Sequence, residues 1–155
     1  MILRDAVEIQ SSPDRVWKIV ADPVAMPLWN DHVLRVTSPG SGPAVGRAYS
    51  IMYALNGKVT ECTGEFTVVE PCHRLVIKVR STAVVPPLEA EERYDLEDQN
   101  GSTLLRQQVI VTSPRVPFPL NMLIWFVMKF GKPTGKRMLE VLKDLAESGS
   151  VGAAT

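Results

Sequence analysis

The fold is decided by residues 117–147, which read PFPLNMLIWFVMKFGKPTGKRMLEVLKDLAE. At helical spacing, one stripe along this stretch carries apolar or small side chains and predicts the face that a helix would turn toward the rest of the protein. The stripe consists of Leu120, Ile124, Val127, Gly131, Thr134, Met138, Leu142 and Leu145. Gly131, Thr134 and the neighbouring Gly135 are small where a core-facing helix usually has large residues. We therefore expect a long C-terminal helix across a sheet, with a hollow beneath these small residues.

The segment Gly131-Lys132-Pro133 supports a second interpretation of the same stretch. Proline costs about 3 kcal/mol in a helix interior, but it is tolerated in a first turn. The segment can therefore break one helix into two. The two interpretations are compatible, because a kink at small residues can widen a hollow.

Length, charge and cysteine content narrow the class of protein. The 155 residues suit one domain, which we place at 1–147 with a flexible tail at 148–155. Seventeen basic residues balance seventeen acidic ones, which argues against a nucleic-acid partner. Cys62 and Cys72 form neither a disulfide framework nor a metal-ligand spacing, so we expect no metal and no cofactor. The N-terminus lacks the order of a signal peptide and the longest apolar run is short, which predicts a cytoplasmic protein without a membrane span.

The rest of the chain predicts one strand, two short helices and then about six consecutive strands. Alternation indicates a first strand with Val7 and Ile9 inward, followed by a helix capped by Ser11 or Ser12 with Pro13 in its first turn. Further strands are expected at 33–37, 46–55, 58–69, 75–80, 88–96 and 103–112. Asn56-Gly57 is a strong signal for a hairpin. Short links between consecutive strands favour an antiparallel sheet, and the fold class is therefore α+β.

The order of these elements resembles the helix-grip fold of the START/Bet v 1-like superfamily, also called SRPBCC. The matching stretches are Ile9 to Trp17, Trp29, Val45-Gly46-Arg47, Val68 to Pro71 with Arg74-Leu75, and Gly101-Ser102-Thr103. Within the superfamily, the chain is most similar to the polyketide cyclase/dehydrase-like branch. The resemblance covers essentially the whole chain and is specific for the fold rather than for a function. It implies a curved antiparallel sheet of about seven strands wrapped around the C-terminal helix, with a ligand cavity between them.

Strand alternation then predicts which side chains line that cavity. If Tyr94 and Leu96 face inward, Glu92 does too, and Leu105 and Val109 bring Gln107 with them. Phe66 and Val68 are expected inward, together with Cys62 and Gly64. The predicted ligand-binding residues are Trp29, Tyr49, Tyr53, Cys62, Phe66, Ile77, Tyr94, Gln107, Val127, Gly131 and Gly135.

Glu92 and His32 are the candidate catalytic residues. A carboxyl group that faces an apolar cavity has a raised pKa, which suits a general acid or base. A register error of one residue would instead place Glu92 among the solvated residues of the run that contains Glu89 and Glu91. His32 is a candidate proton shuttle near the junction of helix and sheet.

Three functions stay open at this point. The first is binding or transport of a small hydrophobic molecule such as a lipid, a polyketide or an isoprenoid-like compound. The second is a metal-free cyclase or dehydratase that uses Glu92 or His32 as its acid or base. The third is a protein-interaction module or homodimer that works through Met122, Trp125, Phe126 and Phe130, which lie off the inward stripe.

Overall fold

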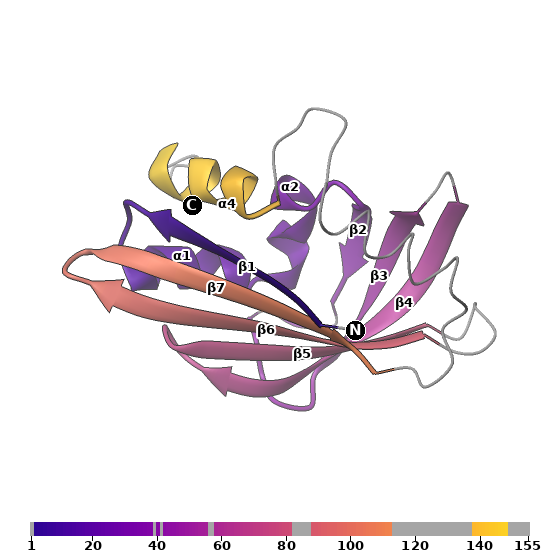
Figure 1. Ribbon diagram of the computed structural model, residues 1–155. Helices are drawn as coiled ribbons and strands as arrows, with labels where there is room; N and C mark the ends of the chain where they lie inside the picture. Colours follow the sequence, from indigo (N-terminus) through magenta and orange to yellow (C-terminus); the bar gives the residue numbers. More distant parts are fainter. Residues whose placement is uncertain are drawn as a thin grey trace.

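The computed structural model describes residues 2–38, 40, 42–55, 58–81, 88–112 and 138–148. Seven antiparallel strands form one sheet in the order β1-β7-β6-β5-β4-β3-β2 (Figure 1). The strands are β1 (Ile2–Ile9), β2 (Val33–Thr37), β3 (Ala48–Leu55), β4 (Lys58–Glu70), β5 (Arg74–Ser81), β6 (Leu88–Gln99) and β7 (Ser102–Val111). The helices are α1 (Pro13–Val20), the 3-10 helix η1 (Pro23–Ala25), α2 (Met26–Trp29) and α4 (Met138–Ser148).

The two short helices after β1 begin where the sequence provides caps. The Ser12 side chain accepts a hydrogen bond from the Arg15 backbone N–H, and Pro13 occupies the first turn of α1. Of the two candidate caps, Ser12 is therefore the one used. Asp22 caps η1 in the same way. Pro27 lies in the first turn of α2, where its missing N–H costs nothing.

Two-residue links connect β3 to β4 and β6 to β7. Asn100 and Gly101 join β6 to β7 with φ angles of 58° and 99°, the left-handed values that a tight hairpin turn requires. The β6 strand consequently continues to Gln99, three residues beyond the predicted end at Leu96. At the predicted Asn56-Gly57 hairpin, Leu55 pairs with Lys58 and residues 56–57 lie outside the described part of the chain.

Alternation places the predicted apolar side chains on one face of the sheet, which we call the inner face. Ile51, Leu75, Ile77 and Leu105 are buried there. The inward prediction for Val68 is wrong, because the register of β4 against β5 shifts between Phe66 and Val68. Such a bulge adds one residue to a strand and exchanges its two faces beyond that point. Val69, opposite Leu75, packs against the core in place of Val68.

The described part of the C-terminal helix packs on the inner face side. Leu139, Leu142 and Ala146 are at most 1% exposed in α4, whereas the predicted stripe residues Met138 and Leu145 are half-buried. The buried stripe is thus centred about one residue away from the predicted one. Residues 113–137, which contain Val127, Gly131 and Gly135, lie outside the described residues, so the hollow beneath the small residues stays a prediction.

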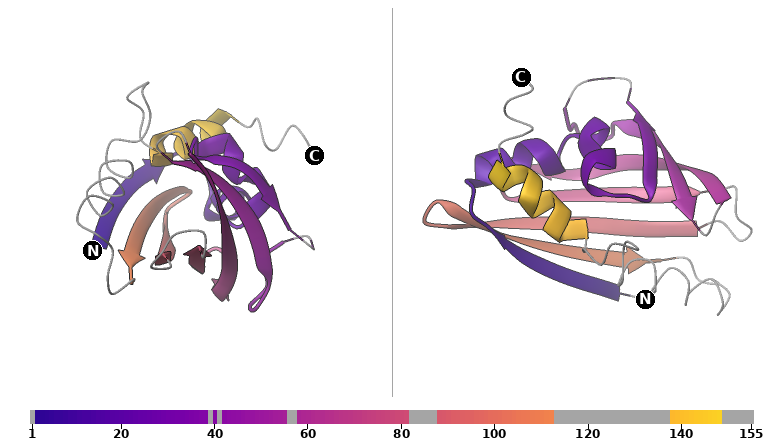
Figure 2. Two further views of the ribbon diagram at one scale, coloured as in Figure 1. Left: turned by 90° about the vertical axis from the view of Figure 1, so that its right-hand side faces the viewer. Right: turned by 90° about the horizontal axis from the view of Figure 1, so that it is seen from above.

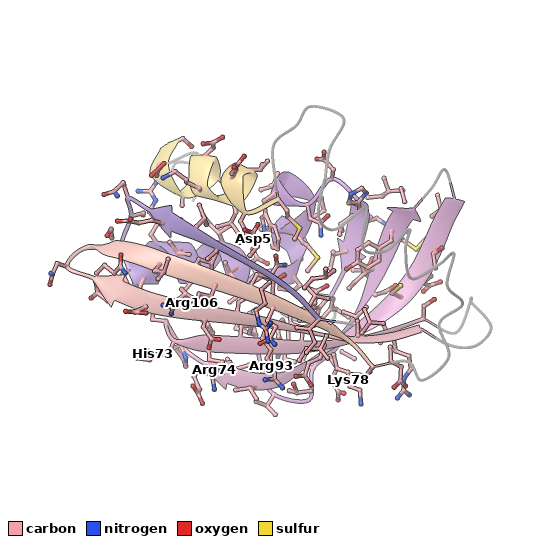
Figure 3. The ribbon with its side chains drawn as sticks, in the orientation of Figure 1. Asp5, His73, Arg74, Lys78, Arg93 and Arg106 are labelled. Carbon is pink, nitrogen blue, oxygen red and sulfur yellow. The ribbon has the colours of Figure 1, made fainter. Side chains whose placement is uncertain are left out.

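The sheet curves around the side on which the helices lie (Figure 2). α4 contacts β1, α1 and α2, while α1 contacts β6 and β7. The helices therefore cover one end of the concave inner face, and the opposite, convex face carries the exposed charged side chains of the strands (Figure 3). This arrangement is the predicted α+β helix-grip fold.

Candidate ligand-binding site on the inner face of the sheet

Glu92 extends from the middle of β6 onto the inner face. It lies opposite Ile77 of β5 and Val109 of β7, both of which are buried. The register alternative, in which Glu92 joins the solvated run with Glu89 and Glu91, is therefore not the one that the strand adopts. Glu92 itself is only half-buried. An acidic side chain that keeps accessible surface among buried apolar neighbours is unusual for a packed core and typical of a binding site.

A chain of two hydrogen bonds ends at the Glu92 carboxyl group. The Gln107 side-chain amide donates to the Tyr94 hydroxyl at 3.2 Å, and that hydroxyl donates to Oε2 of Glu92 at 2.9 Å. No described residue donates a hydrogen bond to Oε1 of Glu92. Burial raises the pKa of Glu92 above its usual value of 4.5, and the bond from Tyr94 opposes this only in part. The surroundings thus favour the protonated carboxylic acid.

The other predicted polar side chains gather within electrostatic range of Glu92. Burial is the main cause that raises the pKa of the Tyr49, Tyr53 and Cys62 side chains, and the charge of Glu92 raises each further. Tyr53 packs against the core but is itself only half-buried. The structure therefore brings these side chains, from β3 and β4, near a carboxyl group on β6, as a curved sheet allows.

Tyr49 lies flat on the sheet because of a glycine beneath it. A Cβ atom at Gly64, its cross-strand partner, would come within 2.5 Å of Cζ of the Tyr49 ring. The ring also lies against Phe66 at a centroid distance of 5.2 Å. Tyr49 is 3% exposed, and its hydroxyl oxygen is buried without a hydrogen-bond partner among the described residues. The glycine thus fixes a ring whose polar end is unsatisfied.

Trp29, the last residue of α2, contacts the site, and His32 lies in the turn before β2. Trp29 is 1% exposed and meets the Tyr94 ring edge-on at 6.2 Å between centroids. Within the part of the chain that the structure describes, Nε1 of Trp29 is buried without a hydrogen-bond partner, and so is Nε2 of the half-buried His32. No described contact joins His32 to Glu92, so the two candidate catalytic residues do not form a visible pair. Of the remaining candidates, Ile77 and Phe66 are buried apolar wall residues.

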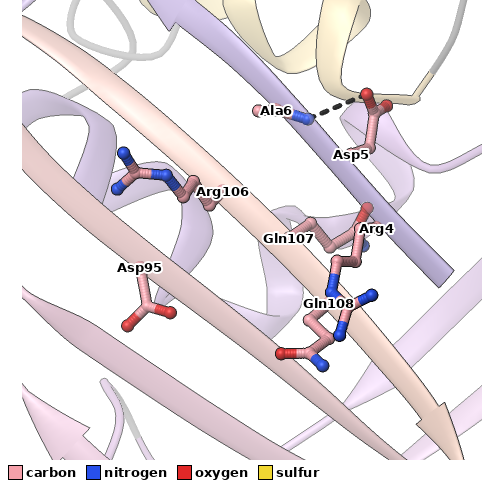
Figure 4. A pocket seen from close by; sticks show the side chains of 7 residues that line it. All are labelled: Arg4, Asp5, Ala6, Asp95, Arg106, Gln107 and Gln108. Carbon is pink, nitrogen blue, oxygen red and sulfur yellow. Dashed lines mark hydrogen bonds between the residues drawn. The ribbon is translucent and has the colours of Figure 1, made fainter. Parts of the chain in front are cut away.

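Sequence reasoning missed Asp5 as a site residue. It pairs with Gln107 across β1 and β7, and its half-buried side chain extends to the opposite side of β1 from Arg4 (Figure 4). The signal was present, because Asp5 alternates in step with Val7 and Ile9, which were predicted inward. On the described strands β1, β5, β6 and β7, Asp5 and Glu92 are the only charged side chains that the pairing places on the inner face away from the β6–β7 hairpin.

A depression of about 510 Å³ lies on the convex face over β1, β7 and β6 (Figure 4). It is lined by Arg4, Asp5, Ala6, Asp95, Arg106, Gln107 and Gln108. Arg106 is paired with Glu97 at 2.7 Å, and both of these side chains are about half exposed. Ion pairs in water contribute little and form readily among alternating surface charges. This depression is therefore an ordinary feature of a charged sheet surface.

Comparison with protein families decides the affiliation of the chain. Residues 10–117 match the family described as Activator of Hsp90 ATPase homolog 1-like protein. The chain belongs to this family. No curated protein matches it.

Solved structures share the fold of this Activator of Hsp90 ATPase homolog 1-like chain at low sequence identity. Protein MLL2253 from Mesorhizobium loti is 21% identical, with a TM-score of 0.71, over 96% of this chain and 98% of the other. Ara h 8.0201 is 11% identical, with a TM-score of 0.69, over 96% and 98%. The di-domain ARO/CYC BexL from the BE-7585A biosynthetic pathway is 16% identical, with a TM-score of 0.68, over 97% of this chain and 47% of the other.

These comparisons confirm the superfamily that the sequence resembles. The neighbours include polyketide cyclase-like and Bet v 1-like structures, so the chain has the SRPBCC fold, which is consistent with ligand binding. Within the described ranges, no helix has the length and apolar character needed to cross a bilayer.

Proposed function

We propose that this protein binds a small, mostly apolar molecule on the inner face of its sheet. The observation that carries the proposal is Glu92: a desolvated carboxyl group that keeps accessible surface amid buried apolar residues. A core built only for stability would carry an apolar residue at this position, because burial of a polar group whose hydrogen bonds are only partly satisfied costs free energy. Affinity would come from apolar ligand surface, at about 25 cal/mol per Å² buried.

The unsatisfied polar atoms around Glu92 support the same proposal. Buried hydrogen-bonding groups nearly always have partners, and each exception needs a reason. Here Nε1 of Trp29 and the hydroxyl of Tyr49 are exceptions on side chains that are at most 3% exposed. A ligand that reaches the inner face would satisfy such groups. The fold family supports this reading, because its members share the architecture in which ligands lie between sheet and C-terminal helix.

Binding can be tested with 6-propionyl-2-(dimethylamino)naphthalene, an uncharged ketone whose emission shifts to the blue in apolar surroundings. Ala90 lies on the inner face two residues before Glu92 and is half-buried, so Ala90→Phe would fill space beside the site. Ala6→Phe places the same ring on the exposed outer face and is the matched control. We expect a blue shift with the wild type and with Ala6→Phe, and its loss with Ala90→Phe. An unchanged signal in a folded Ala90→Phe protein would refute binding at this face.

Catalysis is the second candidate, and the raised pKa of Glu92 favours it specifically. A carboxyl group whose pKa is moved upward is suited to proton transfer near neutral pH. Glu92→Gln separates the two functions, because glutamine keeps the shape and the hydrogen-bond donor but cannot transfer a proton. In a carrier, affinity for the ketone probe would stay nearly unchanged. In an enzyme of the cyclase or dehydratase type, turnover of a polyketone substrate would be lost while binding remained.

A further inference from the structure

We infer that the inner-face site selects uncharged ligands whose polar end is a hydrogen-bond acceptor, such as a ketone, and discriminates against carboxylate and phosphate head groups. The inference rests on the proposed binding function and adds the chemical class of the ligand. It follows from which charges line the face and from which polar atoms there lack partners.

Around Glu92, the charged side chains that are described on the inner face have one sign. Glu92 and Asp5 point to this face, whereas the lysines and arginines of β1, β5, β6 and β7 alternate outward. Lys58 is in phase with the inner face, but it is the first residue of β4, far along that strand from Phe66, which is in line with Ile77 and Glu92. Lys78, Arg93 and Arg106 all lie on the convex side (Figure 3). An anionic head group beside Glu92 would lose its water without gaining a cation from these strands. Burial of an ion without a partner is unfavourable, because the water that it loses is not replaced.

The partnerless polar atoms are mostly donors. The indole N–H of Trp29 can only donate, and a tyrosine hydroxyl such as that of Tyr49 readily does so. The hydrogen bonds around the Glu92 carboxyl group also leave a donor available to a ligand. Gln107 donates to Tyr94 and Tyr94 donates to Oε2 of Glu92, which leaves the acid proton on Oε1. A protonated Glu92 therefore offers one more O–H donor to a ligand carbonyl.

The protonation state of Glu92 links this selectivity to pH. The titratable side chains that interact electrostatically with Glu92 are Tyr49 and Tyr53 of β3, Cys62 of β4 and Tyr94 of β6, and Asp5 of β1 shares the inner face two strands away. All of them are neutral or negative in the accessible pH range, and none can hold Glu92 in its ionised form as a cation would. As pH rises through the raised pKa of Glu92, the donor to the ligand is lost and an unpaired charge appears.

Three naphthalene compounds with one ring system and different polar ends test the inference. They are 2-acetylnaphthalene (neutral acceptor), 2-naphthoate (anion) and 2-(aminomethyl)naphthalene (cation), each used to displace the fluorescent ketone probe at neutral pH. We expect 2-acetylnaphthalene to displace it at least about tenfold better than 2-naphthoate, since about 1.4 kcal/mol corresponds to a factor of ten. With Glu92→Gln, the affinity for 2-acetylnaphthalene should stay within about threefold and lose its decline at high pH. Glu91→Gln, on the outer face of the same strand, should behave like the wild type.

Each outcome has a distinct meaning. Equal or stronger displacement by 2-naphthoate overturns the head-group inference but leaves binding at the inner face intact. Strongest displacement by the amine also overturns it, because Glu92 would then act as a counter-ion. A fluorescent probe that does not bind, or that binds equally to Ala90→Phe, refutes the proposed function itself. If Glu92→Gln fails to fold, the pH dependence of the wild type decides: affinity for the ketone that is constant up to alkaline pH contradicts the role of Glu92.

Discussion

Two tyrosines on the inner face should respond in opposite ways to loss of the hydroxyl group. Tyr94 and Tyr49 are 1% and 3% exposed, so both substitutions by phenylalanine leave an equally buried ring. The Tyr94 hydroxyl accepts from Gln107 and donates to Glu92, whereas the Tyr49 hydroxyl has no partner. The comparison isolates the hydrogen bonds from the hydrophobic contribution of the ring.

The expected magnitudes follow from these contacts. Tyr94→Phe removes two hydrogen bonds and leaves the Gln107 amide, in a residue 7% exposed, without its acceptor. A net hydrogen bond contributes about 0.5–1.5 kcal/mol and an unsatisfied buried group costs about 1–3 kcal/mol, so we expect destabilisation by about 1–3 kcal/mol. Tyr49→Phe removes a buried group that already lacks a partner. We therefore expect no loss, or a gain of up to about 1 kcal/mol.

Urea unfolding of the ligand-free protein, followed by far-UV circular dichroism, measures both values. The urea dependence of the free energy of unfolding should be the same for the wild type and both variants, because the same surface becomes exposed. Tyr49→Phe that costs as much as Tyr94→Phe would refute the assignment of an unsatisfied hydroxyl. Tyr94→Phe without effect would show that the chain from Gln107 to Glu92 does not form.

Three further predictions concern stability. The pKa of Glu92 in the folded protein is raised above 4.5, so protonation of Glu92 stabilises the fold fully in acid, and this stabilisation is lost as pH rises through the folded pKa. Glu92→Gln should therefore be more stable than the wild type in that pH range and equally stable in acid, whereas Glu91→Gln should follow the wild type. Urea unfolding measured at several pH values tests this. Gly64→Ala places a Cβ 2.5 Å from the Tyr49 ring and should destabilise by about 1–3 kcal/mol while changing tyrosine near-UV dichroism; an unchanged spectrum contradicts the close approach. Leu142→Ala, at a fully buried position of α4, should cost about 2–5 kcal/mol in calorimetric unfolding; a cost below 1 kcal/mol would mean that α4 is not docked.

The alternation of inward and outward side chains along the strands predicted most of the fold and most residues of the inner face. Glu92, Tyr94 and Gln107 were placed correctly because strand periodicity is fixed by backbone geometry and needs only one buried neighbour to set its phase. The same logic failed at Val68, since a one-residue bulge leaves no signature in an apolar run such as Phe-Thr-Val-Val. Asp5 was overlooked although its phase was known, because a carboxylate in an N-terminal strand is usually solvated.

Interactions across the curvature of the sheet could not be predicted. The approach of Tyr49 and Tyr53 on β3 to Glu92 on β6 depends on how strongly the sheet coils, which is a collective property of all seven strands. Likewise, a glycine within a strand, such as Gly64, indicates either a β-bulge or a locally less stable strand. The reason that this position needs a residue without a side chain is the Tyr49 ring packed over it. The helix and the hollow that were predicted at Gly131 and Gly135 lie outside the described residues and stay predictions.

Two adjacent glutamines offer the most direct test of ligand binding at the inner face. Gln107 points inward beside Tyr94 and Gln108 points outward over the convex depression (Figure 4). Their side-chain amide signals can be followed by ¹H–¹⁵N NMR during titration with 2-acetylnaphthalene, with assignment by Gln107→Glu and Gln108→Glu. Our account predicts that the Gln107 amide and the Glu92 carboxyl carbon shift together with saturation while the Gln108 amide stays in place. Shifts confined to Gln108, with Gln107 and Glu92 unmoved, would contradict it.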